Sequence, residues 1–222
     1  MRKILVVAAH PDDEVLGCGG AIAKHTSSGD KVDILFMTDG VSSRGYSDSD
    51  VRERKESARQ AADILGVSSV SFLDFPDNEM DSVPLLETVK AIEDVIFDIK
   101  PCVIYTHYSG DLNIDHQVTH RAVLTACRPH PDSFVKEIYS FEVLSSTHWQ
   151  SYSEGASFNP NYFLDISKFM EKKIKSLQCY NKEMREYPHA RSYKVVKSMA
   201  EFRGGVVGLE YSEAFQVVRI VD

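Results

Sequence analysis

The sequence predicts an α/β protein with a Rossmann-like, mostly parallel sheet and helices on both faces, in a single domain that spans residues 1–222. In the first half of the chain, short runs of consecutive apolar residues alternate with segments whose apolar residues recur at helical spacing. Continuous apolar runs are typical of buried parallel strands, and their alternation with helices favours a sheet covered on both faces. Neither an internal repeat nor a long linker is visible, so one domain is expected.

The predicted elements follow in order along the chain. Buried strands are expected at residues 4–9, 32–37, 70–75 and 102–107, and later strands at 137–143 and 214–221. Helices are expected at 51–65 and 85–99, which Gly66 and Pro101 end, and near 167–180 and 192–202. Residues 46–50, 75–80 and 145–161 are expected to form loops whose lengths suit the edge of a substrate site.

The composition is that of a globular protein and argues against several classes of partner. The formal net charge of −8 disfavours nucleic acid or an anionic membrane surface. The apolar run at 4–9 is too short for a membrane span, and the charged residues after it are unlike a signal-peptide cleavage site. The four cysteines are widely spaced, which predicts reduced thiols in a cytoplasmic protein. The sequence leaves open whether the chain forms a homo-oligomer.

A cluster of ionisable residues follows the first predicted strand. Residues 10–14 read His-Pro-Asp-Asp-Glu, which places one imidazole and three carboxylates between a buried strand and a helix. Ligands of open α/β sheets bind at the carboxyl ends of strands, and a divalent cation would offset the repulsion among these acids. His10 and Asp13 are spaced to reach one ion, which leaves Asp12 to accept a proton from water. A helix start with acidic caps explains one or two of the acids, but not all three together with His10.

A second polar cluster, at residues 108–116, follows the strand predicted at 102–107. It offers His116 as a further nitrogen ligand, with Asp115 as a helix N-cap or as an orienting acid. Zinc accepts mixed nitrogen and oxygen ligands, and iron or cobalt also suit this set, so one divalent ion is predicted. His120 follows His116 at i+4 and could bind metal, but a solvated role, or one beside the ligands, is preferred.

Together the two clusters resemble the LmbE-like, or PIG-L-type, N-acetylglucosaminyl de-N-acetylase family. That family carries His-Pro-Asp-Asp-Glu after its first strand and a later Asp-His pair, on a Rossmann-like sheet. The resemblance implies zinc held by His10, Asp13 and His116, with Asp12 as the general base. The helix that carries Arg54 and the segments 189–192, 202–205 and 210–215 resemble further patterns of the family.

One position departs from the family pattern. Many members have a His three residues before the second His ligand, where it acts as acid and oxyanion stabiliser, but this chain has Asn113 there. Either Asp12 carries out both proton transfers, or another group such as His107 reaches the same space. Asn113 or His107 could add a hydrogen bond to the oxyanion.

Three further residues are candidate substrate contacts. Arg54 could pair an anionic group of the substrate, or it could be an exposed helix residue. Asp39 follows the second predicted strand and could touch substrate, although a turn explains it equally well. Arg191 could contact substrate or lock the C-terminal segment, and the sequence favours neither.

The predicted function is that of a zinc-dependent hydrolase that removes the acetyl group from an N-acetylated amino sugar or its conjugate, as the resemblance implies. One alternative is a metal-dependent hydrolase of another amide or of a phosphoester. The other is a catalytically silent module that binds a metal or a ligand. The presence of Asp12 argues against the silent module, because structural zinc sites have four protein ligands and no adjacent base.

Overall fold

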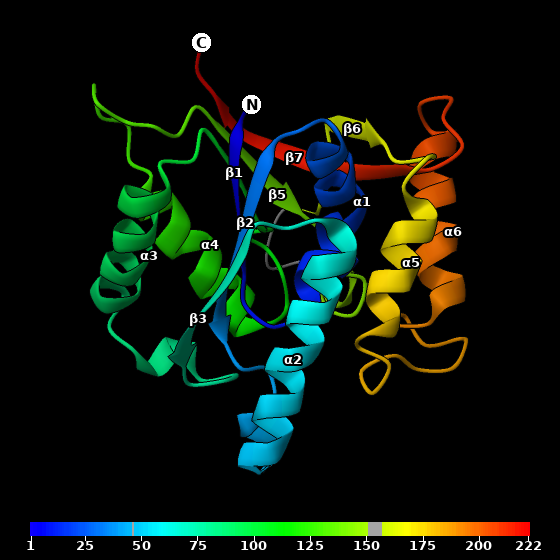
Figure 1. The fold of residues 1–222 in the computed structure, drawn as a ribbon, viewed down its shortest axis with the longest axis horizontal. Coiled ribbons are helices and arrows are strands. Elements are labelled where there is room, and N and C mark those ends of the chain that lie inside the picture. Colours follow the sequence, from blue (N-terminus) through cyan, green and yellow to red (C-terminus); the bar gives the residue numbers. More distant parts are fainter. Residues whose placement is uncertain (46, 151–156) are drawn as a thin grey trace.

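One mixed sheet forms the centre of the molecule (Figure 1). The computed structural model describes residues 1–45, 47–150 and 157–222, and within them the sheet has seven strands. The strands are β1 (Lys3–Ala8), β2 (Lys31–Thr38), β3 (Ser69–Phe75), β4 (Val103–His107), β5 (Glu137–Phe141), β6 (Tyr162–Asp165) and β7 (Ser212–Ile220). Their order is β3-β2-β1-β4-β5-β7-β6. Strands β1 to β5 are parallel, and β7 is antiparallel to β5 and β6. The predicted fold class is confirmed.

Helices cover both faces of the sheet. Among the described residues they are α1 (Asp13–Ser27), α2 (Asp48–Leu65), α3 (Leu85–Ile99), α4 (Ile114–Ala126), α5 (Met170–Gln178) and α6 (Tyr193–Gly205). Helices α3 and α4 pack together on one face, whereas α1, α2, α5 and α6 lie on the other (Figure 1). Each layer buries its own apolar core against the sheet, because alternate side chains of the central strands point to opposite faces.

One strand was missed, and two of the predictions about individual elements are wrong. Strand β6 was not predicted, because its four residues are only partly buried and lack an apolar run. Strand β3 is partly exposed rather than buried, because it is an edge strand. Helix α2 begins at Asp48, inside the loop predicted at 46–50, because Ser47 and Asp50 form a capping box that extends the helix backwards. The other predicted strands and helices end within three residues of the observed ends.

Short helical turns lie between the main elements. One 3-10 turn, η1 (Ser42–Arg44), precedes the loop predicted at 46–50, and a second, η2 (Met80–Ser82), begins at the end of the loop predicted at 75–80. A third, η3 (Thr147–Trp149), lies in the loop predicted at 145–161. Residue 46 and residues 151–156 of the predicted loops lie outside the described residues.

Helix α1 is kinked at Cys18, which has φ −145° and ψ 25°. The kink frees backbone donors that a regular helix would satisfy internally, and the Glu213 carboxylate on β7 accepts two of them. Gly20 N–H donates to it at 2.8 Å and Ala21 N–H at 2.7 Å. Lys173 on α5 pairs with the same carboxylate at 2.6 Å, so a buried charge from β7 fixes the bend in α1.

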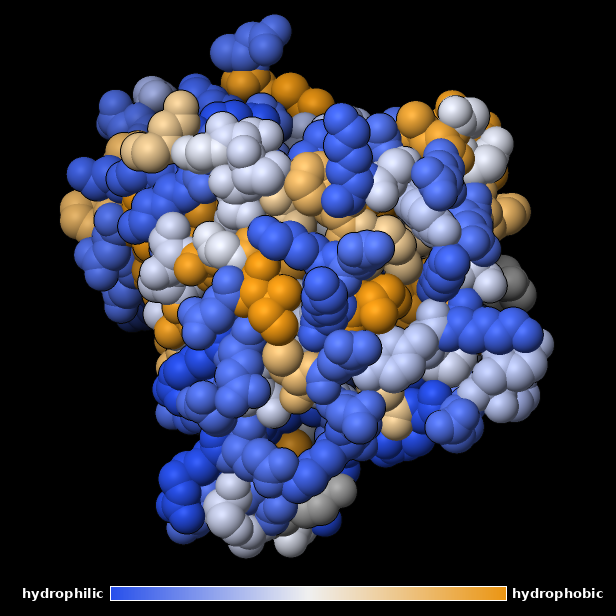
Figure 2. Space-filling model, turned by 45° about the vertical axis from the view of Figure 1, so that its right-hand side comes forward, coloured by the Kyte–Doolittle hydropathy of each residue, from blue (hydrophilic) through white to orange (hydrophobic). Residues whose placement is uncertain are grey.

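Hydrophilic side chains dominate the face of the molecule that Figure 2 presents, and apolar side chains occur there in small groups between them. Among the described residues, no helix combines the length and the apolar character that crossing a membrane requires.

Candidate active site

The structure brings together His10, Asp13 and His116, which the sequence predicted as metal ligands. His10 lies two residues after the end of β1, Asp13 begins α1 and His116 lies in the first turn of α4. Because β1 and β4 are neighbours in the sheet, the segments that follow them meet at the same edge. The Asp13 Oδ2 atom lies 3.1 Å from His10 Nδ1 and 3.1 Å from His116 Nε2, and all three residues are buried.

The charge balance of this cluster suits a cation. His10 Nδ1 and His116 Nε2 lie only 3.3 Å apart, and Asp13 Oδ1 is buried without a hydrogen-bond partner among the described residues. Burial alone would lower the pKa of His10, but hydrogen bonds to Asp115 and Asp13 raise it to about 10. For His116, Asp13 and Asp111 outweigh burial and raise the pKa to about 9. Two nitrogens and one carboxylate oxygen that converge here are a donor set that a divalent metal ion accepts.

Each histidine of the cluster is oriented by a carboxylate on its other ring nitrogen. Asp115 Oδ2 lies 3.0 Å from His10 Nε2, and Asp111 Oδ1 lies 3.1 Å from His116 Nδ1. Such carboxylate–imidazole pairs fix the ring and its tautomer in metal sites. The N-cap of α4 is Asn113, so the N-cap alternative for Asp115 is wrong, and its carboxylate faces His10.

Asp12 lies beside the cluster in a backbone conformation that costs energy. Its φ of 117° belongs to the left-handed region, which costs on the order of 1–3 kcal/mol for a residue other than glycine. Its Oδ2 accepts hydrogen bonds from Arg54 at 3.0 Å and from Arg191 at 3.1 Å. Its Oδ1 is buried and has no partner among the described residues. Burial raises the pKa of Asp12, although the two arginines oppose it. One oxygen is thus held by cations while the other is left to accept a proton.

The arginines that hold Asp12 are themselves tied to Glu183. Its carboxylate lies 3.1 Å from Arg54, 3.5 Å from Arg191 and 3.0 Å from Arg44. Only 6% of Arg54 is exposed, so the interpretation of Arg54 as an exposed helix residue is wrong. The guanidinium groups of Arg54 and Arg191 therefore bridge two carboxylates. One is Asp12, which lies beside the predicted metal ligands (called the metal cluster below), and the other is Glu183, which contacts none of them.

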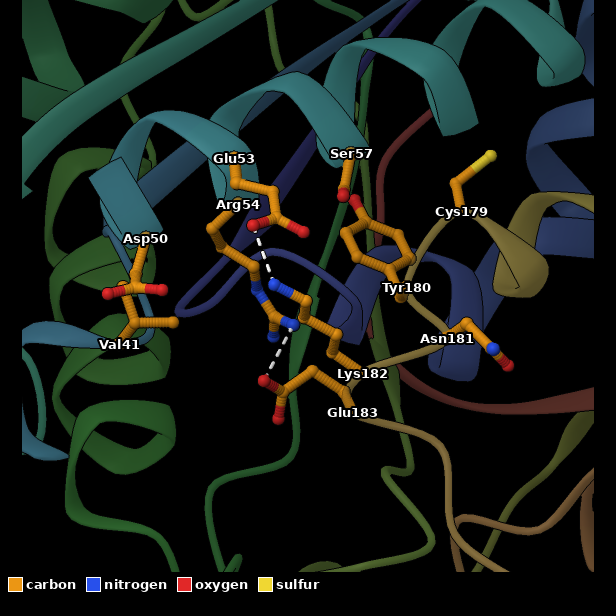
Figure 3. Close-up of a pocket in the computed structure, with 10 residues that line it drawn as sticks. All are labelled: Val41, Asp50, Glu53, Arg54, Ser57, Cys179, Tyr180, Asn181, Lys182 and Glu183. Atoms are coloured by element: carbon orange, nitrogen blue, oxygen red, sulfur yellow. Dashed lines mark hydrogen bonds and ion pairs between the residues drawn. The ribbon is translucent and has the colours of Figure 1, made fainter. Parts of the chain in front are cut away.

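A cavity of about 240 Å³ lies between α2 and residues 179–183. Figure 3 shows Arg54 reaching from α2 toward Glu183, with Glu53 and Lys182 paired beside them. Arg54 lines this cavity and also contacts Asp12, and none of the three predicted ligands is among its lining residues. The cavity therefore lies behind Arg54, separate from the metal cluster.

The two candidates for oxyanion stabilisation both have partners within the protein, although His107 Nδ1 is buried without a hydrogen-bond partner among the described residues. His107 is fully buried, its Nε2 accepts a hydrogen bond from Ala9 N–H at 2.8 Å, and its ring stacks on His116 with centroids 3.8 Å apart. Burial and the neighbouring His116 hold the pKa of His107 well below its ordinary value, so the ring is neutral. Asn113 Oδ1 accepts the N–H groups of Asp115 and His116, and its Nδ2 donates to Asn78 at 3.1 Å.

Two other predicted candidates have structural partners. Asp39 Oδ1 accepts the backbone N–H groups of Val41 at 2.8 Å and Ser42 at 2.9 Å, so the carboxylate closes a turn after β2. His120 Nδ1 donates to the carbonyl of His107 at 2.8 Å. His120 belongs neither to the group of His10, Asp13 and His116 nor to the other described group that could hold a metal ion, which consists of His10, Asp77 and Asp115.

The model of the PIG-L family, described as GlcNAc-PI de-N-acetylase, matches residues 5–127. The chain belongs to the PIG-L family. The resemblance predicted from the two polar clusters is therefore confirmed.

Similarity to individual proteins and to a solved structure extends over nearly the whole chain. The diacetylchitobiose deacetylase of Thermococcus kodakarensis is 28% identical over 98% of this chain and 84% of that protein. The 4-oxalmesaconate hydratase of Pseudomonas putida is 29% identical over 80% of this chain and 72% of that protein. The crystal structure of the conserved protein TT1542 from Thermus thermophilus has a TM-score of 0.81 and 26% identity. That match covers 100% of this chain and 97% of the other.

Three acidic residues of this PIG-L chain take part in the site but were not predicted. Asp111 orients His116, Glu183 ties the arginines, and Asp77 Oδ1 lies 3.4 Å from His10 Nε2. Asp111 belongs to the second polar cluster, five residues before His116, so an Asp–His pairing could have been sought there. No local pattern marks Glu183 or Asp77, because only the folded chain brings them to the site.

Proposed function

We propose that this PIG-L chain is a metal-dependent hydrolase that removes the acetyl group from an N-acetylated amino sugar or its conjugate. The supporting observation is the convergence of His10, Asp13 and His116 beside an Asp12 oxygen that has no partner among the described residues. We propose zinc as the metal, held by these three residues. A bound zinc ion would polarise the acetamide carbonyl and lower the pKa of water at the site.

The residues of the chain account for the proton transfers. Asp12 accepts the proton of the attacking water at Oδ1 while the water oxygen bonds to the acetyl carbon. The carbon–nitrogen bond then breaks, and Asp12 returns the proton to the leaving amine. Arg54 and Arg191 hold Oδ2, so that Oδ1 keeps a fixed direction through both transfers. Acetate and a free amino sugar result.

His107 and Asn113 are given positioning roles in this proposal. The Nε2 of His107 is occupied by Ala9 N–H, and the stacked ring fixes the orientation of His116. Asn113 caps α4 and so fixes the turn that presents His116. Asp12 is therefore the group we assign to both proton transfers.

The substrate class is supported by the relatives. One of them is a diacetylchitobiose deacetylase that aligns with 98% of this chain, and the family description names a GlcNAc conjugate. We also propose a cytoplasmic location, which the four free cysteines support. The assembly state stays a prediction for size measurements in solution.

Hydration is the second candidate function, because a hydratase is 29% identical over 80% of this chain. Addition of water also needs a group that takes a proton from water, so Asp12 suits both reactions. The experiment incubates the purified protein and its Asp12→Asn variant with acetamido sugars, with other acetamides and phosphoesters, and with 4-oxalmesaconate. Acetate release from sugars supports the proposal, provided that it needs Asp12 and bound metal. The proposal would be overturned if the metal-loaded protein turned over only 4-oxalmesaconate, or if it turned over none of these compounds.

A further inference from the structure

We propose that Trp149 and Leu112 form an apolar platform beside the metal cluster, on which the ring attached to the acetamido sugar of the substrate stacks. This inference rests on the proposed function and deepens it, because it selects disaccharides and other ring-bearing conjugates over the free monosaccharide.

The turn that carries Trp149 is fastened to the metal cluster. Trp149 ends η3, and the hydroxyl of Thr147 in the same turn donates to the Asp111 carboxylate. Ser146, which directly precedes η3, donates to Asp111 Oδ2 at 3.0 Å and lies 3.4 Å from His116 Nδ1. Because Asp111 also orients His116, the position of Trp149 is fixed relative to a predicted metal ligand.

The ring of Trp149 also faces the segment that delivers Arg191 to Asp12. Its centroid lies 6.1 Å from that of His189, with the two rings edge to face at 82°. His189 Nδ1 accepts the backbone N–H of Arg191 at 3.0 Å, and the Arg191 guanidinium reaches Asp12 at 3.1 Å. Trp149 therefore joins the two segments that orient the metal ligand and the base.

Two large apolar side chains are exposed on the segments that meet at Asp111. Trp149 is 55% exposed, and Leu112, which directly follows Asp111 in the chain, is 52% exposed. Tryptophan is highly buried on average, so an indole that is held exposed on a turn fastened to the polar cluster is a candidate ligand contact. Ser146, Thr147 and Asp111 are paired with one another within the protein, so the exposed apolar side chains suit a ligand that is apolar on one face and uncharged.

A sugar ring has this character, because its axial C–H groups form an apolar face while its hydroxyls stay in water. The indole ring offers a large flat surface and one N–H donor, which suits such an amphipathic partner. The metal cluster and Asp12 would engage the acetamido group, so the platform beside them would take the neighbouring ring of a conjugate.

The direct test uses the intrinsic fluorescence of Trp149, which is the only tryptophan in the sequence. The metal-loaded Asp12→Asn variant, which should bind substrate without turning it over, is titrated with N,N'-diacetylchitobiose, with N-acetylglucosamine and with maltose. We expect a saturable change in Trp149 emission with the disaccharide, at a concentration at least tenfold below that needed for N-acetylglucosamine. An unchanged emission at saturating disaccharide, with binding verified by calorimetry, would overturn the inference.

The kinetic test compares Trp149→Ala with Trp149→Phe in the otherwise native enzyme. Trp149→Ala should raise KM for diacetylchitobiose about tenfold, with kcat and the kinetics on N-acetylglucosamine nearly unchanged. Trp149→Phe keeps an aromatic ring, so its KM for diacetylchitobiose should stay close to that of the native enzyme. Phe97→Ala is the matched control, because Phe97 is another exposed aromatic residue and lies at the end of α3 that leads into the amino end of β4, whereas the site follows the carboxyl end of that strand.

Three results would contradict the platform. They are an unchanged KM for the disaccharide, an equal loss of kcat on both sugars, and a change of molecular mass in solution with sugar kinetics intact. The last would assign Trp149 to an interface between copies of the chain. If the wild-type enzyme releases no acetate from either sugar, the proposed function fails, and the fluorescence titration still decides whether Trp149 binds a sugar ring.

Discussion

Replacing Asp12 by Asn tests the proposed chemistry at its centre. The substitution keeps the size of the side chain and leaves an amide oxygen that can face Arg54 and Arg191, as Oδ2 does now. The amide nitrogen then occupies the place of Oδ1, where it can donate a hydrogen bond but cannot accept a proton. We expect kcat to fall by about 10²–10⁴-fold, which corresponds to about 2.7–5.4 kcal/mol in the activation barrier.

The same substitution has a separate and smaller effect on stability. Two hydrogen bonds between a carboxylate and a guanidinium become bonds to a neutral oxygen, and charge-assisted bonds are about twice as strong as neutral ones. Each bond to a charged group contributes about 1.5–3 kcal/mol and loses about half of it, so we expect the two bonds together to lose about 1.5–3 kcal/mol of unfolding free energy. For a chain of this length the melting temperature should fall by about 3–12 °C.

The assay measures acetate release at saturating substrate together with the metal content of each variant. Glu183→Gln is the matched control, since Glu183 contacts the same two arginines but does not touch Asp12 or the metal cluster. We expect it to lower kcat by less than about tenfold. Near-normal turnover of metal-loaded Asp12→Asn would refute the assignment of Asp12 as base. An equal loss in Glu183→Gln would show that the arrangement of charges, and not proton acceptance, explains the effect.

Three further predictions concern metal, packing and pH. His116→Ala should strip most of the metal while the far-ultraviolet circular dichroism stays native, and full metal content by elemental analysis would remove His116 from the ligand set. Arg54→Ala should lower the unfolding free energy by about 1.5–3 kcal/mol in denaturant titrations, because Asp12 and Glu183 each lose one buried cationic partner, while Arg191 still contacts both carboxylates and Arg44 still contacts Glu183. A change below about 0.5 kcal/mol would show that the contacts of Arg54 with these carboxylates do not stabilise the fold. Burial raises the pKa of Glu142, but hydrogen bonds from His148 and Arg203 outweigh it and hold that pKa below its ordinary value. The contribution of the Glu142 ion pair to the unfolding free energy is therefore complete above about pH 4.3 and is lost as pH falls through the folded pKa. In denaturant titrations, Glu142→Gln should unfold at a lower free energy than wild type at pH 7, and this difference should narrow in acid. A difference that is independent of pH would contradict the ion pair.

The fold could be predicted where burial leaves a continuous apolar pattern, and it was missed where burial is partial. The strands of the first half are apolar because they are covered on both faces, and their runs are visible in the sequence. Strand β6 contributes only Tyr162–Asp165 at the other edge of the sheet, where partial burial removes the constraint that makes a strand recognisable. The start of α2 depends on Ser47 and Asp50, whose capping pattern was present but was assigned to a loop.

The candidate site divides in the same way. His10, Asp13 and His116 follow strand ends in short polar motifs, and these motifs are enough to predict that the three side chains meet. Arg54 was harder, although a signal existed. It is four residues before Ala58 and therefore continues the buried face of α2, which its charge concealed. Glu183 has no such signal, because its role depends on how the segment after α5 packs against α2.

The kink in α1 has a consequence for the order in which the protein folds. Glu213 accepts the N–H of Gly20, which is 193 positions away in the chain. Strand β7, which lies between β5 and β6, must join the sheet before the Glu213 carboxylate can reach that N–H. Contacts between residues so far apart require the closure of a long loop and form slowly. The three predicted metal ligands are all synthesised within the first 116 residues, yet the helix that presents Asp13 gains its final support only when β7 joins the sheet. We therefore expect metal capture to be a late event in folding, and an emerging chain that lacks β7 to hold the ion poorly even though every ligand is present.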